Sequence, residues 1–150
     1  MKFVIHINTL ITNNEEKQFL LVKEKKEQVL NKLNLPGGHL EPGEGLVEGA
    51  RREVMEEVNA EVKIQGLIGI YTGRGNDHYI NFIFLGKIAN DTPSANKEHV
   101  NEIGWYTADE IQKIPEDQIL NPKKLKKIIA AHQQGRLSSL DLIEEMIYPN

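Results

Sequence analysis

The alternation of hydrophobic and polar positions predicts strands at the start of the chain. Residues 3–12 alternate with a period of two, as expected for a strand that is at least half-buried. A polar turn at residues 13–17 and an apolar run at residues 18–22 follow, and together they predict a β-hairpin. The two faces of the first strand carry Phe3, Ile5, Ile7 and Ile11 on one side and Val4, His6, Asn8 and Leu10 on the other.

The middle of the chain changes to a helical period. A glycine-rich loop leads to Gly45, and the helix that follows is expected to end near Val58. Apolar side chains recur along it at the spacing of a core-facing stripe, namely Val47, Ala50, Val54 and Val58. This helix is therefore expected to lie against the sheet.

Beyond the central helix the pattern predicts more strands and then more helices. In chain order these are a strand at 61–71, a turn at 72–77, a strand at 78–88, a polar loop at 90–101, a strand at 103–106, and helices at 107–111, 122–134 and 140–147. On the 122–134 helix the lysines are expected to form a solvated outer face, comprising Lys123, Lys124, Lys126 and Lys127. This order of elements predicts an α/β sandwich with a mixed central sheet, in a single domain spanning residues 1–150.

Three acidic residues share one side of the central helix: Glu53, Glu56 and Glu57. At roughly 100° per residue, their carboxylates fall within an arc of about 100°. Taken alone, such a cluster is typical of a solvated acidic face. However, like charges at these spacings repel one another, and a hard cation such as Mg²⁺, which takes oxygen ligands, would relieve that repulsion.

The stretch around these acids favours the metal-binding interpretation. Gly38 is followed, after five residues, by Glu44 and, after seven more, by the run from Arg52 to Glu57, REVMEE. This spacing resembles the signature of the Nudix hydrolases, G-x5-E-x7-R-E-U-x-E-E-x-G-U, and an LPGG lead-in precedes it. A pattern of this length is far more specific than a glycine-rich loop alone.

The stretch departs from the signature at its end, where Asn59 replaces a glycine and Ala60 replaces a larger aliphatic residue. A residue just past a helix end often takes the left-handed conformation, and Asn is the usual substitute for Gly there. We therefore expect Asn59 to be left-handed. Neither departure changes a proposed metal ligand.

The resemblance implies a Nudix-type α/β/α sandwich and hydrolysis of a phosphoric anhydride bond in a nucleoside diphosphate linked to another group. It assigns Mg²⁺, or Mn²⁺ as a substitute, to the Gly38 carbonyl, Glu53, Glu56 and Glu57. The ion would neutralise the phosphates and lower the pKa of the attacking water. In the family, the pair that corresponds to Glu44 and Arg52 is tied together and braces the loop against the helix.

A further acid is expected on the polar loop before Trp105. Nudix proteins often place an additional metal ligand or general base there, and Glu98 is the first choice, with Glu102 as the alternative. The general base varies across the family, so Glu53 and Glu98 both remain candidates for it. By itself, each loop acid would more often be simple loop polarity.

Composition limits the other possibilities. The net charge of −4 lacks the basic footprint of a nucleic-acid-binding protein, and the absence of cysteine excludes a thiolate metal site or a cysteine nucleophile. Polar residues interrupt the N-terminal apolar run before it reaches the length of a secretory signal, and no run is long enough to span a membrane. A cytoplasmic protein, monomeric or homodimeric, acting on a nucleotide-type small molecule is therefore expected.

Two alternatives remain at this point. The chain could be a Nudix-fold sensor that binds a nucleotide without cleaving it, although the intact Arg52-Glu53 and Glu56-Glu57 pairs favour an enzyme. It could also be a non-catalytic interaction module that uses its terminal helices. The sequence does not identify the nucleotide substrate, the general base or the number of metal ions.

Overall fold

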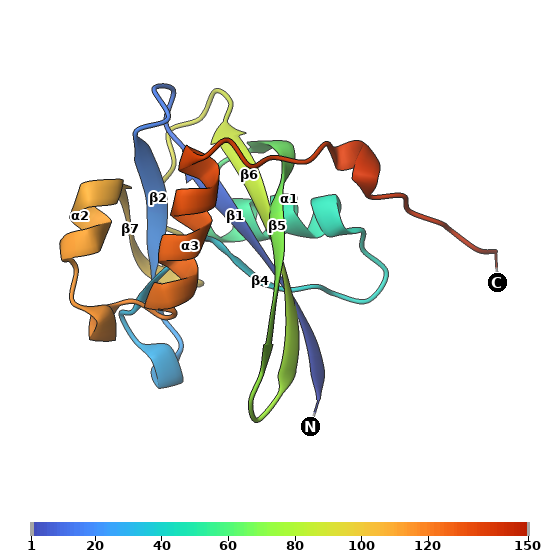
Figure 1. Cartoon of the computed structure of the whole chain (residues 1–150), viewed down its shortest axis with the longest axis horizontal. Helices are drawn as coiled ribbons and strands as arrows, with labels where there is room; N and C mark the ends of the chain where they lie inside the picture. The colour runs from blue at the N-terminus through green and yellow to red at the C-terminus, as the bar shows by residue number, and fades with distance from the viewer. Residues whose placement is uncertain (1, 150) are drawn as a thin grey trace.

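The computed structural model describes residues 2–149 as a mixed sheet with helices on both faces (Figure 1). The strands are β1 (Phe3–Thr12), β2 (Gln18–Glu24), β3 (Leu33–Asn34), β4 (Gly37–His39), β5 (Val62–Arg74), β6 (His78–Ile88) and β7 (Val100–Thr107). The helices are α1 (Leu46–Val58), α2 (Ala108–Lys113) and α3 (Pro122–Gln133), with short 3₁₀ helices η1 (Glu27–Val29), η2 (Glu116–Gln118) and η3 (Leu140–Leu142). The predicted α/β sandwich is confirmed.

The sheet opens between β1 and β2. The strand order is β3-β2-β1-β6-β5, and β1 runs parallel to β6 along its whole length. β1 and β2 pair where Thr12 lies opposite Phe19, but nearer its start β1 pairs instead with β4, from His6↔His39 to Asn8↔Gly37. β2 meanwhile pairs with β7 and β3. The two central strands therefore diverge after one shared pair, and each continues against different neighbours, β1 against β4 and β2 against β7 and β3.

Alternating side chains of the strands pack into two separate hydrophobic cores, one on each face of the sheet. On β2, Leu20 and Val22 pack with the α1 side, whereas Phe19 and Leu21 pack with the side covered by α2 and α3. The stripe on α1 that is fully buried against the sheet consists of Ala50, Val54 and Val58. This packing fixes the rotation of α1, and with it the direction in which the acids of α1 point.

The start of β1 differs from the sequence-based expectation. Phe3 and Ile5 were predicted on a half-buried face, yet they are 77% and 40% exposed. The reason is that β1, β5 and β6 extend together beyond the two helical layers, as Figure 1 shows at the lower end of the sheet. From Ile7 onward both faces of β1 are buried.

The C-terminal helix predicted at residues 140–147 is wrong. Only the single 3₁₀ turn η3 forms there, and the chain then leaves the body of the protein without regular structure (Figure 1). Leu140 and Ile143 still pack against the core on the α1 side, but Met146 and Ile147 are 67% and 87% exposed, so the apolar spacing does not continue into packing beyond Ile143. Without packing, a short amphipathic segment gains too little to form a helix.

Among residues 2–149, none of the helices is both long enough and apolar enough to cross a bilayer.

Candidate active site

A cavity of about 510 Å³ lies where the sheet opens, and helices from both layers border it. Its residues include Asn8 of β1, Glu24 of β2, and Gly37 and Gly38 of β4. The remaining walls carry Glu53, Glu56 and Glu57 of α1, Tyr79 of β6, and Lys124 of α3. The cavity therefore has an acidic wall on α1 and a basic and aromatic wall formed from β1, β6 and α3.

The acidic wall is a consequence of how α1 packs. Val54 and Val58 are buried against the sheet. Glu57 lies between these two residues in the sequence, and its side chain is turned inward and is only 6% exposed. Glu53, one turn earlier, is half-buried, and both carboxylates line the cavity with Glu56. The structure thus brings together the three acids that the sequence grouped.

Burial dominates the electrostatics of Glu57. It is the main reason that the pKa of this carboxyl rises from its ordinary 4.5 to about 9, and the charges of nearby Glu24 and Glu53 act in the same direction. The opposing influences are the Gly37 N–H, which donates to Glu57 Oε1 at 2.7 Å, and the more distant Lys26. Within the part of the chain that the structure describes, no basic side chain forms an ion pair with Glu57.

Two consecutive glycines allow β4 to pass close to the acids. A Cβ at Gly38 would lie 2.6 Å from Glu53 Oε1, and a Cβ at Gly37 would lie 2.7 Å from the Cα of Asn8. A side chain at Gly37 would therefore push β4 away from β1, whereas one at Gly38 would displace the Glu53 carboxylate. The backbone of Gly38 consequently lies directly beside the Glu53 carboxylate, as its proposed ligand role requires.

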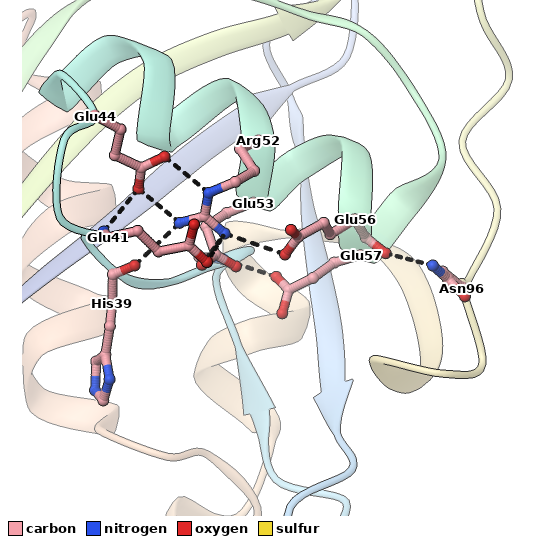
Figure 2. A network of polar contacts seen from close by, with 9 residues as sticks. His39, Glu41, Glu44, Arg52, Glu53, Glu56, Glu57 and Asn96 are labelled. Carbon is pink, nitrogen blue, oxygen red and sulfur yellow. Dashed lines mark hydrogen bonds and ion pairs between the residues drawn. The ribbon is translucent and has the colours of Figure 1, made fainter.

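Arg52 links the loop to the helix (Figure 2). Its guanidinium donates through Nε and Nη2 to the two oxygens of Glu44, at 2.8 and 2.7 Å, and through Nη2 to the carbonyl of His39 at 3.1 Å. Glu44 also accepts the Glu41 N–H at 2.9 Å. The bond from Arg52 holds the pKa of Glu44 below its usual range.

The Glu44–Arg52 pair is more buried than a simple surface ion pair. The exposed fractions of the two side chains are 9% and 21%, and the bidentate geometry fixes both of them. Removing only one partner would therefore leave a largely buried charge uncompensated, which is destabilising.

Arg52 also reaches the acidic wall. Its Nη1 donates to Glu53 at 3.0 Å and to Glu56 at 3.2 Å, as the dashed lines in Figure 2 show. Burial raises the pKa of Glu53, while the charge of Arg52 opposes that rise. In residues 2–149, no three acidic or histidine side chains converge closely enough to hold a metal ion as they stand. The guanidinium neutralises Glu53 and Glu56 instead.

The oxygen donors nevertheless suit a hard divalent cation. Glu57 is a buried carboxylate without a counter-charge, and the Gly38 backbone abuts the Glu53 carboxylate. Carboxylate and carbonyl oxygens are the ligands that Mg²⁺ takes in proteins. To join these donors, Glu53 and Glu56 would have to exchange Arg52 for the cation and converge on it.

A loop closes over the C-terminal end of α1. Asn96 donates its backbone N–H to the carbonyl of Glu57 at 3.0 Å and its side-chain Nδ2 to the carbonyl of Glu56 at 2.8 Å. Its Oδ1 accepts the Glu98 N–H, and its carbonyl accepts the His99 N–H. Asn96 therefore satisfies carbonyls that the helix end leaves free, and it fixes the turn that follows against the acidic wall.

The two loop acids lie outside the cavity. Glu98 is exposed and does not line it, whereas its neighbour His99 does. Glu102 forms an ion pair of 2.7 Å with Lys23 on the surface. The role of Glu98 as ligand or base therefore remains a prediction, and it would require the side chain to turn inward.

The opposite wall contains residues that the sequence did not single out as a group. Lys124 was expected on a solvated outer face, but it is half-buried, and its Nζ donates to Asn81 Oδ1 at 2.8 Å. That expectation is corrected. Lys124 precedes the buried Ile128 by one helical turn, so helical spacing could have placed it on the inner side. For Asn81, which is fully buried on β6, the sequence contained no comparable spacing that would have predicted its role.

Comparisons with known proteins agree with this geometry. The NUDIX domain family matches residues 2–128 of the chain. A mouse relative named 8-oxo-dGDP phosphatase NUDT18 is 31% identical over 108 residues, which cover 70% of this chain and 33% of the relative. The chain thus spans about a third of that protein's length. Phosphatase NudJ of Shigella boydii is 28% identical over 154 aligned positions, covering 98% of this chain and 95% of the relative.

Among solved structures, a NUDIX hydrolase from Nitrosomonas europaea superimposes with a TM-score of 0.85 at 27% identity. The match covers 97% of this chain and 98% of that protein. The overall fold is thus one that a NUDIX hydrolase also has.

Proposed function

The chain belongs to the Nudix hydrolase family, and we propose that it is a Mg²⁺-dependent pyrophosphohydrolase that cleaves a nucleoside diphosphate linked to another group. The single observation that carries the proposal is the buried Glu57 carboxylate, which lies in a cavity beside Glu53 and Gly38 without a cationic partner. A carboxylate in this position is costly unless a cation or a proton neutralises it. A divalent ion that a diphosphate also binds supplies the missing charge.

Glu53, Glu56, Glu57 and the Gly38 carbonyl would hold the ion. When bound, Mg²⁺ would neutralise the diphosphate and lower the pKa of the attacking water. Glu53 and Glu56 would then release Arg52 Nη1, to which both carboxylates now hydrogen-bond. Arg52 would keep its bidentate bond to Glu44, so the loop and the helix would stay braced during this exchange.

The protein's own groups have three roles in this proposal. The Gly37 N–H orients Glu57, and the Glu44–Arg52 pair orients the loop that carries Gly38. Glu53 is the stronger candidate for the general base, because it lines the cavity and its pKa is raised by burial. Glu98 remains the second candidate, on a loop that Asn96 ties to α1.

The substrate proposal stays at the level of a class. The names of the relatives describe phosphatases, including one that acts on 8-oxo-dGDP, and they support a nucleotide-type substrate. The cavity supports this too, since its basic and aromatic wall could contact the parts of a nucleotide that the acids do not. Nucleoside triphosphates, ADP-ribose, dinucleoside polyphosphates and sugar nucleotides are all members of the class.

A panel of these compounds, assayed with and without Mg²⁺, tests the proposal. We expect Mg²⁺-dependent, saturable release of a phosphate-containing product from at least one of them. Glu56→Gln and Glu57→Gln should each lower turnover by about two orders of magnitude or more, because each removes a charge from the ion's ligands. Glu48→Gln is the matched control, since Glu48 is exposed on the same helix and does not line the cavity.

Two results would contradict the proposal. If nucleotides bind but no compound is cleaved, the chain is a sensor rather than a hydrolase. If Glu57→Gln turns over like the unmodified protein at limiting Mg²⁺, the assignment of the metal ligands is wrong.

A further inference from the structure

A continuous hydrogen-bonded relay crosses the sheet beneath the cavity. Lys124 Nζ donates to Asn81 Oδ1 at 2.8 Å, Asn81 Nδ2 donates to Asn8 Oδ1 at 3.0 Å, and Asn8 Nδ2 donates to the Leu35 carbonyl at 3.0 Å. Asn81 is fully buried and Asn8 is 8% exposed. The relay joins α3 on one side of the sheet to β6, β1 and the segment that leads into β4.

The direction of this relay follows from its fixed end. The Leu35 carbonyl can only accept, so Asn8 must turn its amide nitrogen toward it and offer its oxygen to Asn81. Asn81 must then donate with its own nitrogen, which leaves its oxygen facing α3. Only a donor can satisfy that oxygen, and Lys124 is the donor that the structure places there. Each asparagine uses its side-chain oxygen and one of its two amide N–H bonds along the relay.

Lys124 retains unused donors. An ammonium group has three N–H bonds, and the described contacts of Lys124 are one hydrogen bond, to Asn81, and a position 5.2 Å from the centre of the Tyr79 ring. No ion pair forms between Lys124 and an acidic side chain in residues 2–149. A half-buried ammonium with spare donors at a cavity wall is well placed to bind an acceptor in that cavity.

Further basic residues line the same cavity. They are His6, His39, Lys26 and His99, and the acids Glu53, Glu56 and Glu57 line it from α1. The rings of His6 and His39 are 4.6 Å apart, and Tyr79 stands 6.1 Å from His6 at an edge-on angle. Burial, followed by the charges of His39 and Lys124, lowers the pKa of His6 to about 4, so His6 is neutral at neutral pH. Lys124 therefore supplies charge beside a largely aromatic surface.

We propose that Lys124 is a substrate-recognition residue that binds an acceptor oxygen in the part of the substrate extending away from the acidic wall. This inference rests on the proposed function and deepens it, since it concerns which substrates fit the same cavity. The acceptor is an oxygen of a phosphate beyond the cleaved bond or a carbonyl oxygen of the base, because both present the lone pairs that an ammonium binds. The Asn81–Asn8 relay holds Lys124 in position from behind.

Binding of nucleotides that resist cleavage tests this inference without relying on turnover. The probes are the α,β-methylene analogue of GDP and the α,β:β,γ-bismethylene analogues of GTP and ATP, measured with Mg²⁺ by calorimetry on the full chain and on Lys124→Gln. Comparing GTP with ATP changes the base carbonyl to an amino group, whereas comparing GTP with GDP removes a phosphate. Lys127→Gln is the control, since Lys127 lies one turn from Lys123 on the exposed side of α3.

We expect Lys124→Gln to weaken binding of the preferred analogue by about ten- to a hundredfold, as for the loss of one charge-assisted hydrogen bond. The loss must be unequal across the probes. Loss of the preference for GTP over ATP identifies the carbonyl, and loss of the preference for GTP over GDP identifies the phosphate. Lys124→Arg, which keeps the charge and the donors, should bind more tightly than Lys124→Gln.

An equal loss of affinity for all three analogues, or no loss, overturns the inference. A lysine with a purely structural role would not change the ratios between the affinities for these analogues. The melting temperature of each variant distinguishes misfolding from lost recognition. If Lys124→Gln does not fold, the GTP-to-ATP and GTP-to-GDP affinity ratios of Lys124→Arg test the inference instead. The longer, planar guanidinium of arginine should change at least one of these ratios. Unmodified protein that binds the analogues but cleaves none of the parent nucleotides contradicts the proposed hydrolysis, while leaving the role of Lys124 intact.

Discussion

The backbone N–H of Gly37 donates to Oε1 of Glu57 across a distance of 2.7 Å, and it is the one hydrogen bond that this buried carboxylate accepts from residues 2–149. A strand of only three residues, β4, thus orients the most buried acid of α1. This relationship is consistent with glycine at both positions, since a side chain at Gly37 would force β4 away from β1 and one at Gly38 would displace the Glu53 carboxylate. It also leaves Glu57 with too little compensation for its charge unless a cation binds.

The first prediction concerns the stability of the metal-free protein. Burial raises the pKa of Glu57 from 4.5 to about 9, so the folded protein keeps a proton that the unfolded chain releases. The stabilisation is complete below about pH 4.5 and is lost as the pH rises toward about 9. Glu57→Gln removes this titration. In EDTA, the melting temperature of Glu57→Gln should therefore increase relative to that of the unmodified protein as the pH rises.

The comparison between the two proteins cancels the titration of other groups, such as Glu53 and His6, which have shifts of their own. Adding Mg²⁺ at about pH 8 should raise the melting temperature of the unmodified protein and have little effect on Glu57→Gln. A difference between the two proteins that does not change with pH would mean that Glu57 is already charged in the metal-free fold.

The second prediction separates bracing from stability at Arg52. Arg52→Ala leaves Glu44, whose side chain is 9% exposed, without its bidentate partner, so the melting temperature should fall and activity should fall by about tenfold or more. Adding Glu44→Ala to this variant removes the unpaired acid. The double variant should regain stability without regaining activity, because neither residue then orients the loop. Recovery of both would show that the pair serves stability alone.

The third prediction concerns the end of α1. Asn59 has φ 52° and ψ 37°, which confirms the left-handed conformation expected from the sequence. Asn59→Gly should change the free energy of unfolding by no more than about 0.5 kcal/mol, since the bonds it loses to Ser94 are exposed. Asn59→Val should cost about 1 kcal/mol or more, because a β-branched residue resists positive φ. Chemical denaturation measures both, and equal stability of the two variants would be inconsistent with this backbone.

The fourth prediction concerns Asn96 as a positioning residue. Asn96→Ala removes the donor to the Glu56 carbonyl and the acceptor for the Glu98 N–H. The last turn of α1 should then hold its acids less firmly, so the Mn²⁺ affinity measured by electron paramagnetic resonance should fall several-fold. Turnover at saturating metal should change less. Asn76→Ala, in the exposed β5–β6 turn, is the control; an Asn96→Ala variant with unchanged metal affinity would contradict the positioning role.

Local sequence patterns predicted the parts of the fold that depend on local physics. The helix spacing located α1, its buried stripe and the shared side of Glu53, Glu56 and Glu57. The left-handed Asn59 followed from its place just past the helix end. In each case the information lies within one or two helical turns, so it could be obtained from the chain alone.

The features that the sequence did not predict depend on contacts between distant segments. Lys124 turns inward because the fully buried Asn81 of β6, 43 positions away, offers its side-chain oxygen as an acceptor. Phe3 is exposed because the sheet extends beyond its helices, and past Ile143 the apolar side chains of Met146 and Ile147 are exposed. Periodicity shows which side of an element is apolar, but it does not show what covers that side.

The mechanism is tested most directly by where the oxygen of water goes. Cleavage of the best substrate in ¹⁸O-labelled water, with Mg²⁺, should place the label on a phosphorus of one product in a single turnover, and phosphomonoesters such as p-nitrophenyl phosphate should be poor substrates. The acidic wall of Glu53, Glu56 and Glu57 supports this expectation, since it suits an ion shared with a diphosphate rather than a covalent intermediate. A trapped phosphoenzyme, or efficient hydrolysis of the monoester, would contradict it.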